Sequence, residues 1–110
     1  MTRAAILGLF LVACAPPACS DEAEQRLAAD VRALVRDDGP VGEAAGRRLH
    51  AAGARAIAWL EPGLYDAGPA ARRRIIKAMA GTPEARPILE HLARLDPDED
   101  VRAAATRALR

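Results

Sequence analysis

The sequence aligns with itself at a shift of 30 residues, and this internal repeat limits the possible folds more than any other feature. At this shift Tyr65 falls on Leu95, and Trp59 falls on Leu89. Three further sets of aligned positions are apolar and a fourth is basic. These sets are Val41, Ala71 and Val101; Ala45, Ile75 and Ala105; Leu49, Met79 and Leu109; and the basic set Arg47, Lys77 and Arg107. Because a single helix pair cannot bury its apolar face alone, we expect the repeated units to stack.

Proline and glycine residues divide the chain after residue 20 into helical segments, and no window shows sustained alternation of apolar and polar residues. The first two expected helices cover residues 21–36 and residues 40–50. A short helix begins at residue 54 and ends at Pro62 and Gly63. Two more begin at residues 69 and 83, and residues 96–99 mark the beginning of the last one. We therefore predict an all-α fold, a short α-α solenoid of about six helices. An irregular helical bundle is the alternative.

Several helix ends carry expected caps. Thr82 is expected to cap a helix that has Pro83 at its first position. Asp96 with Glu99 three residues later is close to a capping box.

The helix over residues 21–36 is a candidate N-terminal cap of the whole repeat array. The last helix either caps the other end, which we expect, or meets another molecule.

The composition predicts an aliphatic core without a strongly charged surface. Hydrophobic residues make up 51% of the chain and aromatic residues only 3%. Alanine dominates the aliphatic set, and it favours helices and lets helix axes approach closely. We expect Trp59 in this core rather than exposed as an anchor for a partner. The formal net charge of +1 gives no strong field for polyanions, so nucleic acid is not an expected partner.

The first fourteen residues, MTRAAILGLFLVAC, have the pattern of an export signal. Arg3 precedes an apolar run over residues 4–13, which is far shorter than the roughly 20 residues that span a bilayer as a helix. We therefore expect this segment to be cleaved. A soluble secreted product, with a cut after Ser20, and a retained apolar N-terminus are the alternatives.

Leu11-Val12-Ala13-Cys14 resembles the bacterial lipobox, in which the cysteine receives a diacylglyceryl thioether before the preceding peptide is removed. The resemblance implies a signal peptide over residues 1–13, a lipid on Cys14 and a tether over residues 14–20. It also implies a membrane-anchored protein of the bacterial cell envelope. Ala15, which is not Asp, is typical of lipoproteins sent to the outer membrane, so we expect the periplasmic face of that membrane. Cys19 is then the one cysteine without a lipid, and we expect a bystander thiol rather than a disulfide to another chain.

Residues 95–109, LDPDEDVRAAATRAL, closely resemble the signature of short HEAT-like repeats of the phycobiliprotein-lyase type. In that signature a turn with Asp and Pro leads into Val-Arg and an alanine-rich helix that ends in Leu. Residues 70–79 match less well but keep Arg72, and residues 41–49 match least because Gly42 and Gly46 dilute the helix. The resemblance covers residues 37–110 within a repeat domain over residues 21–110. It implies a solenoid of HEAT-like helical hairpins that contacts a protein partner, which the sequence does not name.

The sequence brings no catalytic or metal-binding set together. His50 and His91 lie in different units without Cys or carboxylate partners at metal-ligand spacing. Serine occurs only at Ser20, and no nucleophile stands beside a base. The acidic residues 96–100 lack the glycine and distal Glu of a calcium-binding loop. We therefore expect no metal, no cofactor and a non-enzymatic role; an enzyme, an enzyme subunit or a chaperone-like factor related to the chromophore lyases is the alternative.

Basic residues form the candidate partner surface. At about 100° per residue, Arg73, Arg74 and Lys77 project away from the apolar stripe of their helix. The 30-residue shift adds Arg47 and Arg107 to this surface by aligning them with Lys77. Such a surface suits an acidic partner or anionic lipid headgroups near the anchor. The alternative is a solvated face whose arginine stems cover apolar helix surface.

Overall fold

The computed structural model describes residues 21–110 of the 110-residue chain, and residues 21–36 are helical. The elements that follow are α2 (Pro40–Ala52), α3 (Ala54–Asp66), α4 (Pro69–Met79), the 3₁₀ turn η1 (Pro83–Ala85), α5 (Arg86–Leu95) and α6 (Glu99–Ala108). The described residues contain no strand, which confirms the predicted all-α fold. Among them, no helix combines the length and the apolar character that a membrane span requires. The predicted signal peptide, Cys14 and the tether with Cys19 lie outside the described residues.

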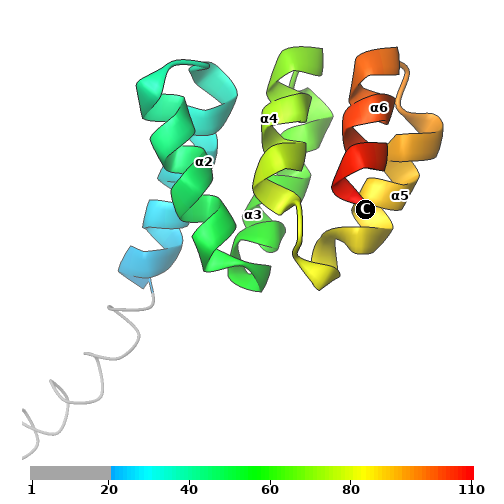
Figure 1. Ribbon diagram of the computed structural model, residues 1–110. Coiled ribbons are helices and arrows are strands. Elements are labelled where there is room, and N and C mark those ends of the chain that lie inside the picture. The colour runs from blue at the N-terminus through cyan, green and yellow to red at the C-terminus, as the bar shows by residue number, and fades with distance from the viewer. Residues whose placement is uncertain (1–20) are drawn as a thin grey trace, which may run out of the picture.

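The helices stack as hairpins in two layers (Figure 1). Helices α2, α4 and α6 stand side by side in one layer, which we call the front layer; residues 21–36, α3 and α5 form the back layer. Contacts run from α2 to α4, from α4 to α6 and from α5 to α6, so each unit packs on the next. This arrangement confirms the predicted solenoid and is not an irregular bundle.

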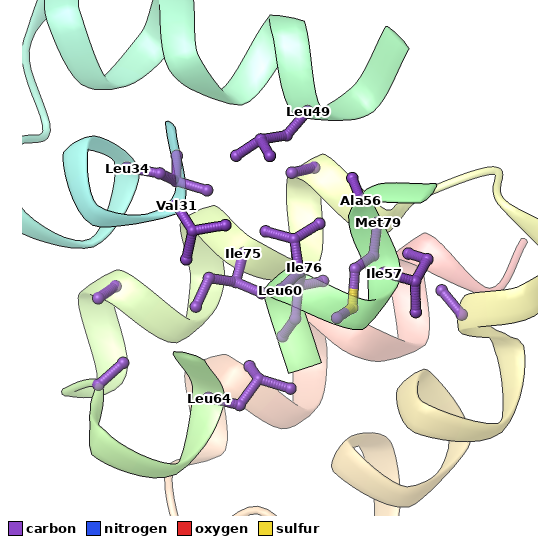
Figure 2. Packing of buried hydrophobic residues seen from close by; sticks show 14 of the residues in the cluster. Val31, Leu34, Leu49, Ala56, Ile57, Leu60, Leu64, Ile75, Ile76 and Met79 are labelled. Atoms are coloured by element: carbon purple, nitrogen blue, oxygen red, sulfur yellow. The ribbon is translucent and has the colours of Figure 1, made fainter. Parts of the chain in front are cut away.

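The core between the layers is aliphatic, as the composition predicts. Its centre is formed by side chains that are at most 2% exposed: Leu49, Leu60, Ile75, Ile76 and Met79 (Figure 2). Trp59 is partly buried and packs against this core, where its indole N–H donates a 2.6 Å hydrogen bond to Glu24 Oε2. The only tryptophan therefore ties α3 to the first helix instead of standing exposed.

The first helix covers one end of the array. Leu27, Val31 and Leu34 are buried against the core, whereas the polar residues on the other side of this helix are exposed. Arg48 of α2 donates to the carboxylate of Asp30, with 2.8 Å between Nη2 and Oδ1. This hydrogen bond and the attraction of the carboxylate raise the pKa of Arg48. The arrangement agrees with the expected N-terminal cap.

The first unit departs from the repeat at one position. The alignment groups Val41 with the buried Ala71 and Val101, but Val41 is 61% exposed and Gly42 is buried in its place. A Cβ atom on Gly42 would lie 1.7 Å from the carbonyl oxygen of Asp37. Only glycine therefore fits where α2 passes the end of the first helix.

Three expected helix boundaries are wrong. Helix α3 continues through Pro62, because the exposed proline is followed by a last turn that buries Leu64, and this packing outweighs the hydrogen bond that proline removes. Thr82 makes no side-chain cap and precedes η1, so α5 begins only at Arg86. Helix α6 is capped by Asp98, whose Oδ1 accepts from the Val101 N–H at 3.0 Å, and not by Asp96.

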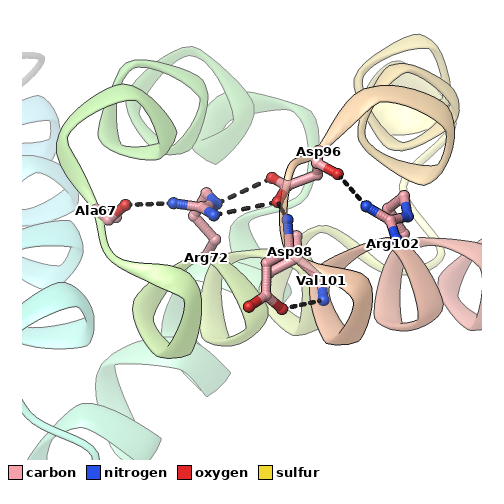
Figure 3. A network of polar contacts seen from close by, with 6 residues as sticks. All are labelled: Ala67, Arg72, Asp96, Asp98, Val101 and Arg102. Carbon is pink, nitrogen blue, oxygen red and sulfur yellow. Dashed lines mark hydrogen bonds and ion pairs between the residues drawn. The ribbon is translucent and has the colours of Figure 1, made fainter.

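Asp96 instead forms a buried ion pair with Arg72 of α4 (Figure 3). Arg72 donates through Nε to Asp96 Oδ2 at 2.9 Å and through Nη2 to Oδ1 at 3.1 Å, and its Nη1 donates to the Ala67 carbonyl at 2.7 Å. Asp96 Oδ1 also accepts from the Asp98 N–H, and the Asp96 carbonyl accepts from Arg102. These contacts join the turn before α4 to the turn before α6, and so lock the second unit to the third.

We expect Arg72→Met to lower the free energy of unfolding by about 3–5 kcal/mol, because the variant leaves the buried carboxylate of Asp96 without its cation. Urea unfolding followed by circular dichroism measures this loss. Arg73→Met is the matched control, since its 3.7 Å ion pair with Asp100 is solvent-exposed and is expected to contribute less than about 1 kcal/mol. Equal losses in the two variants would contradict the interlocking role of Arg72.

We expect Gly42→Ala to lower the stability and Gly46→Ala to keep or raise it. The new Cβ at position 42 would meet a backbone oxygen that cannot move away, and overpacking of this kind costs about 1–3 kcal/mol. At position 46 the Cβ would meet only Leu34 Cδ1 at 3.2 Å, a side-chain tip that can shift. There alanine gains up to about 1 kcal/mol in helix propensity, so stability stays equal or rises. Thermal unfolding of both variants tests the pair.

Candidate functional site

A groove of about 980 Å³ lies between α2 and α4, in the front layer. Each helix lines it with one stripe of residues, and Leu34 and Asp38 complete its wall. The stripes are Gly42, Glu43, Gly46, Arg47 and His50 on α2, and Ala70, Arg73, Arg74, Lys77 and Ala78 on α4. The structure thus brings four of the five predicted partner-surface residues to one groove, and Arg107 stands beyond it on α6.

Small side chains contribute to both walls of the groove. Gly42 and Gly46 line it from α2, and Ala70 and Ala78 line it from α4. At a shift of 30 residues the next unit has Arg72 and Ile76 at the positions of the two glycines, and both are partly or fully buried. The glycines that weaken the repeat signature in the first unit thus belong to the lining of the groove.

Arg74 has a structural role in the wall of the groove. Its Nε donates to the carbonyl of Leu34 and its Nη2 to the carbonyl of Val35, both at 2.8 Å. These carbonyls belong to the last turn of the first helix, whose negative dipole end favours a cation. Arg73 is more weakly held, at 3.7 Å from Asp100. The sequence grouped both residues with the partner surface, but two donors of Arg74 are already used within the fold.

Arg47, Lys77 and Arg107 occupy equivalent positions on the three helices of the front layer, and we call them the basic row. All three side chains belong to exposed residues. In the part of the chain that the structure describes, none of these three side chains makes a hydrogen bond or an ion pair with another residue. Helices α2, α4 and α6 stand side by side (Figure 1). The three equivalent positions therefore recur from one helix of the front layer to the next.

The histidines do not form a common site. His50 lies at the end of the groove, where its Nδ1 is 3.2 Å from the carbonyl oxygen of Ala78 and so connects α2 to α4. His91 lines another groove, on α5. Within residues 21–110, no group of three or more His, Cys, Asp or Glu side chains is placed to hold a metal ion.

The second groove, of about 510 Å³, lies between α3 and α5 in the back layer, and the sequence analysis missed it. Two exposed apolar residues border it, Tyr65 at 80% and Leu95 at 63% exposure. The 30-residue shift aligns these two residues, and this alignment is the one signal for them in the sequence. It indicates a repeat position and does not by itself indicate an exposed surface.

Comparison with known protein families identifies the general type of the repeat. The family described as HEAT repeats matches residues 18–110, a stretch that includes the first helix as well as the three units. No curated protein and no solved structure gives a significant match. HEAT repeats typically mediate protein–protein contacts and are generally non-catalytic. The match does not distinguish the narrower phycobiliprotein-lyase type, which stays a prediction. With a match over most of its length and the stacked hairpins of Figure 1, the chain belongs to the family of HEAT-repeat proteins.

Proposed function

We propose that this chain is a lipid-anchored, non-enzymatic HEAT-repeat module that holds a partner protein at the membrane of the bacterial cell envelope, on the periplasmic face of the outer membrane. The observation that carries the binding role is the groove between α2 and α4, whose lining combines small residues with two exposed cations, Arg47 and Lys77, that make no ion pair in the described part of the chain. A concave surface with a few polar groups is the usual form of a binding site.

The composition of both grooves supports a binding role rather than catalysis. The linings of the two grooves include no Ser, Thr or Cys that a neighbouring base could activate as a nucleophile. Two charged side chains of these linings, Arg72 and Arg74, are used for contacts within the fold. Binding through exposed surface cations is therefore the role that these residues fit best.

The anchoring role rests on the sequence of the first fourteen residues. The apolar run ends in Leu11-Val12-Ala13-Cys14, and six residues separate Cys14 from Asp21. Two or more acyl chains on such a cysteine hold a protein stably at a membrane, whereas a single chain holds it only marginally. A fully extended chain spans about 3.3–3.6 Å per residue, so this tether keeps the repeat domain close to the membrane surface.

We expect wild-type protein from bacterial membranes to have the mass of a chain that begins at Cys14, increased by acyl chains. Cys14→Ala is expected to lose the added lipid mass and to leave the membrane fraction, because no thiol remains at the modified position. Intact-mass spectrometry of the fractionated cells measures both effects.

Cys19→Ala is the matched control for this experiment. It removes the other cysteine of the chain and is expected to keep the lipid and the membrane location. Wild-type protein without any added lipid mass would refute the anchor.

A further inference from the structure

The C-terminal halves of the three front-layer helices carry positively charged side chains and no negatively charged ones. No acidic residue occurs in residues 44–52 of α2, anywhere in α4, or in residues 101–108 of α6. The same stretches hold the basic row together with other arginines. Acids of this layer are confined to the helix beginnings, for example Glu43 and Asp100. An acidic ligand that crosses the C-terminal halves therefore meets cations on all three helices and no acidic residue of these stretches, because the two acids that line the groove, Asp38 and Glu43, precede them in the chain.

From this charge distribution we propose that the basic row receives an acidic, extended segment of the partner protein, which lies across α2, α4 and α6 and enters the groove beside Arg47 and Lys77. The proposal rests on the proposed function, since it names the chemistry of the partner. It differs from a helix bound by its apolar stripe, because the only exposed large apolar residue of the described front layer is Val41.

The spacing of the row favours a particular backbone. Packed helices lie about 8–10 Å apart, so neighbouring cations of the row recur at about this distance across the layer. A polyproline II segment has three residues per turn and rises about 3.1 Å per residue, which returns every third side chain to the same face after about 9 Å. Carboxylates at every third residue of such a segment match the three cations one to one.

An anionic membrane fits this surface less well than an acidic segment does. The first helix runs antiparallel to α2, so its beginning lies at the same edge of the array as the ends of α2, α4 and α6 (Figure 1). This edge also carries the exposed acids Asp21 and Glu22, and Glu84 of η1. A flat bilayer that reached the row would meet these acids as well, whereas a narrow peptide follows the front layer alone.

The test compares two labelled peptides of equal composition by fluorescence anisotropy, with the full chain in a nonionic detergent. One peptide repeats Glu-Pro-Pro three times, and the other places its three Glu together. The first is expected to bind at least several-fold more tightly, and its affinity is expected to fall as salt screens the charges. Equal affinities would overturn the proposed register.

The triple variant Arg47→Ser, Lys77→Ser, Arg107→Ser is expected to weaken binding of the spaced peptide about tenfold or more, since three pairs of modest strength are lost together. The matched control is the triple variant Arg32→Ser, Arg36→Ser, Arg94→Ser, which removes the same charge from exposed residues of the back layer and is expected to change affinity less than twofold. Circular dichroism confirms that both variants remain helical. Equal weakening by the two variants would contradict the proposal.

Lys77 offers a direct reading of the contact, because it is the only lysine of the chain. A carbodiimide joins an amine to a carboxylate as an amide with loss of water, and we expect it to couple Lys77 to a Glu of the bound peptide. Peptide mass spectrometry identifies the linked residue. Absence of this link at saturating peptide would overturn the placement of the segment on the row.

Further outcomes distinguish this inference from lipid binding and from the proposed function. Phosphatidylglycerol added to the micelles at the same negative charge is expected to leave peptide binding intact; complete displacement would assign the row to lipid headgroups instead. A cellular partner that binds the row variant as well as wild type would refute the inference and leave the proposed function standing. Wild-type protein that carries no lipid in the Cys14 experiment would refute the anchoring role and leave the peptide result unaffected.

Discussion

Each helical hairpin of this chain carries more apolar surface than it can bury by itself, and this excess holds the array together. Ala45, Ile75 and Ala105 occupy the same place in successive units and are completely buried. Each front-layer helix packs on the next, so removal of one unit would expose the apolar face of its neighbour. Apolar burial has no preferred direction, so it does not fix the orientation of one unit relative to the next. The buried ion pair of Arg72 and Asp96 supplies this fixed orientation between two units.

The sequence was sufficient to predict the architecture because the fold is periodic. A shift of 30 residues aligned the positions that became core, and the excess of alanine over aromatic residues matched the closely packed helices. The predictions failed where a tertiary contact overrides a local signal. Proline ends most helices, but α3 continues past Pro62 because its last turn buries Leu64. Asp96 has the sequence pattern of a cap, but it faces an arginine that is distant in the chain.

The candidate surface was predictable only in outline. Spacing placed Arg47, Lys77 and Arg107 on equivalent faces, and the structure has them on three neighbouring helices. The capping role of Arg74 depends on carbonyls about 40 positions earlier in the chain, at 34 and 35, which no local pattern indicates. The groove itself was hidden because Gly42 and Gly46 looked like defects of a repeat. Their effect depends on which helix faces them, and that is a property of the packed array.

The two junctions between units are bridged by different contacts. At the turn before α6, the side chain of Arg72 is held to Asp96 by two hydrogen bonds. Between the first and second units, Arg74 holds the last turn of the first helix and His50 contacts the Ala78 carbonyl. The groove between α2 and α4 stays open beside these contacts. An occupant of this groove would therefore contact the leading hairpin and the second unit at the same time.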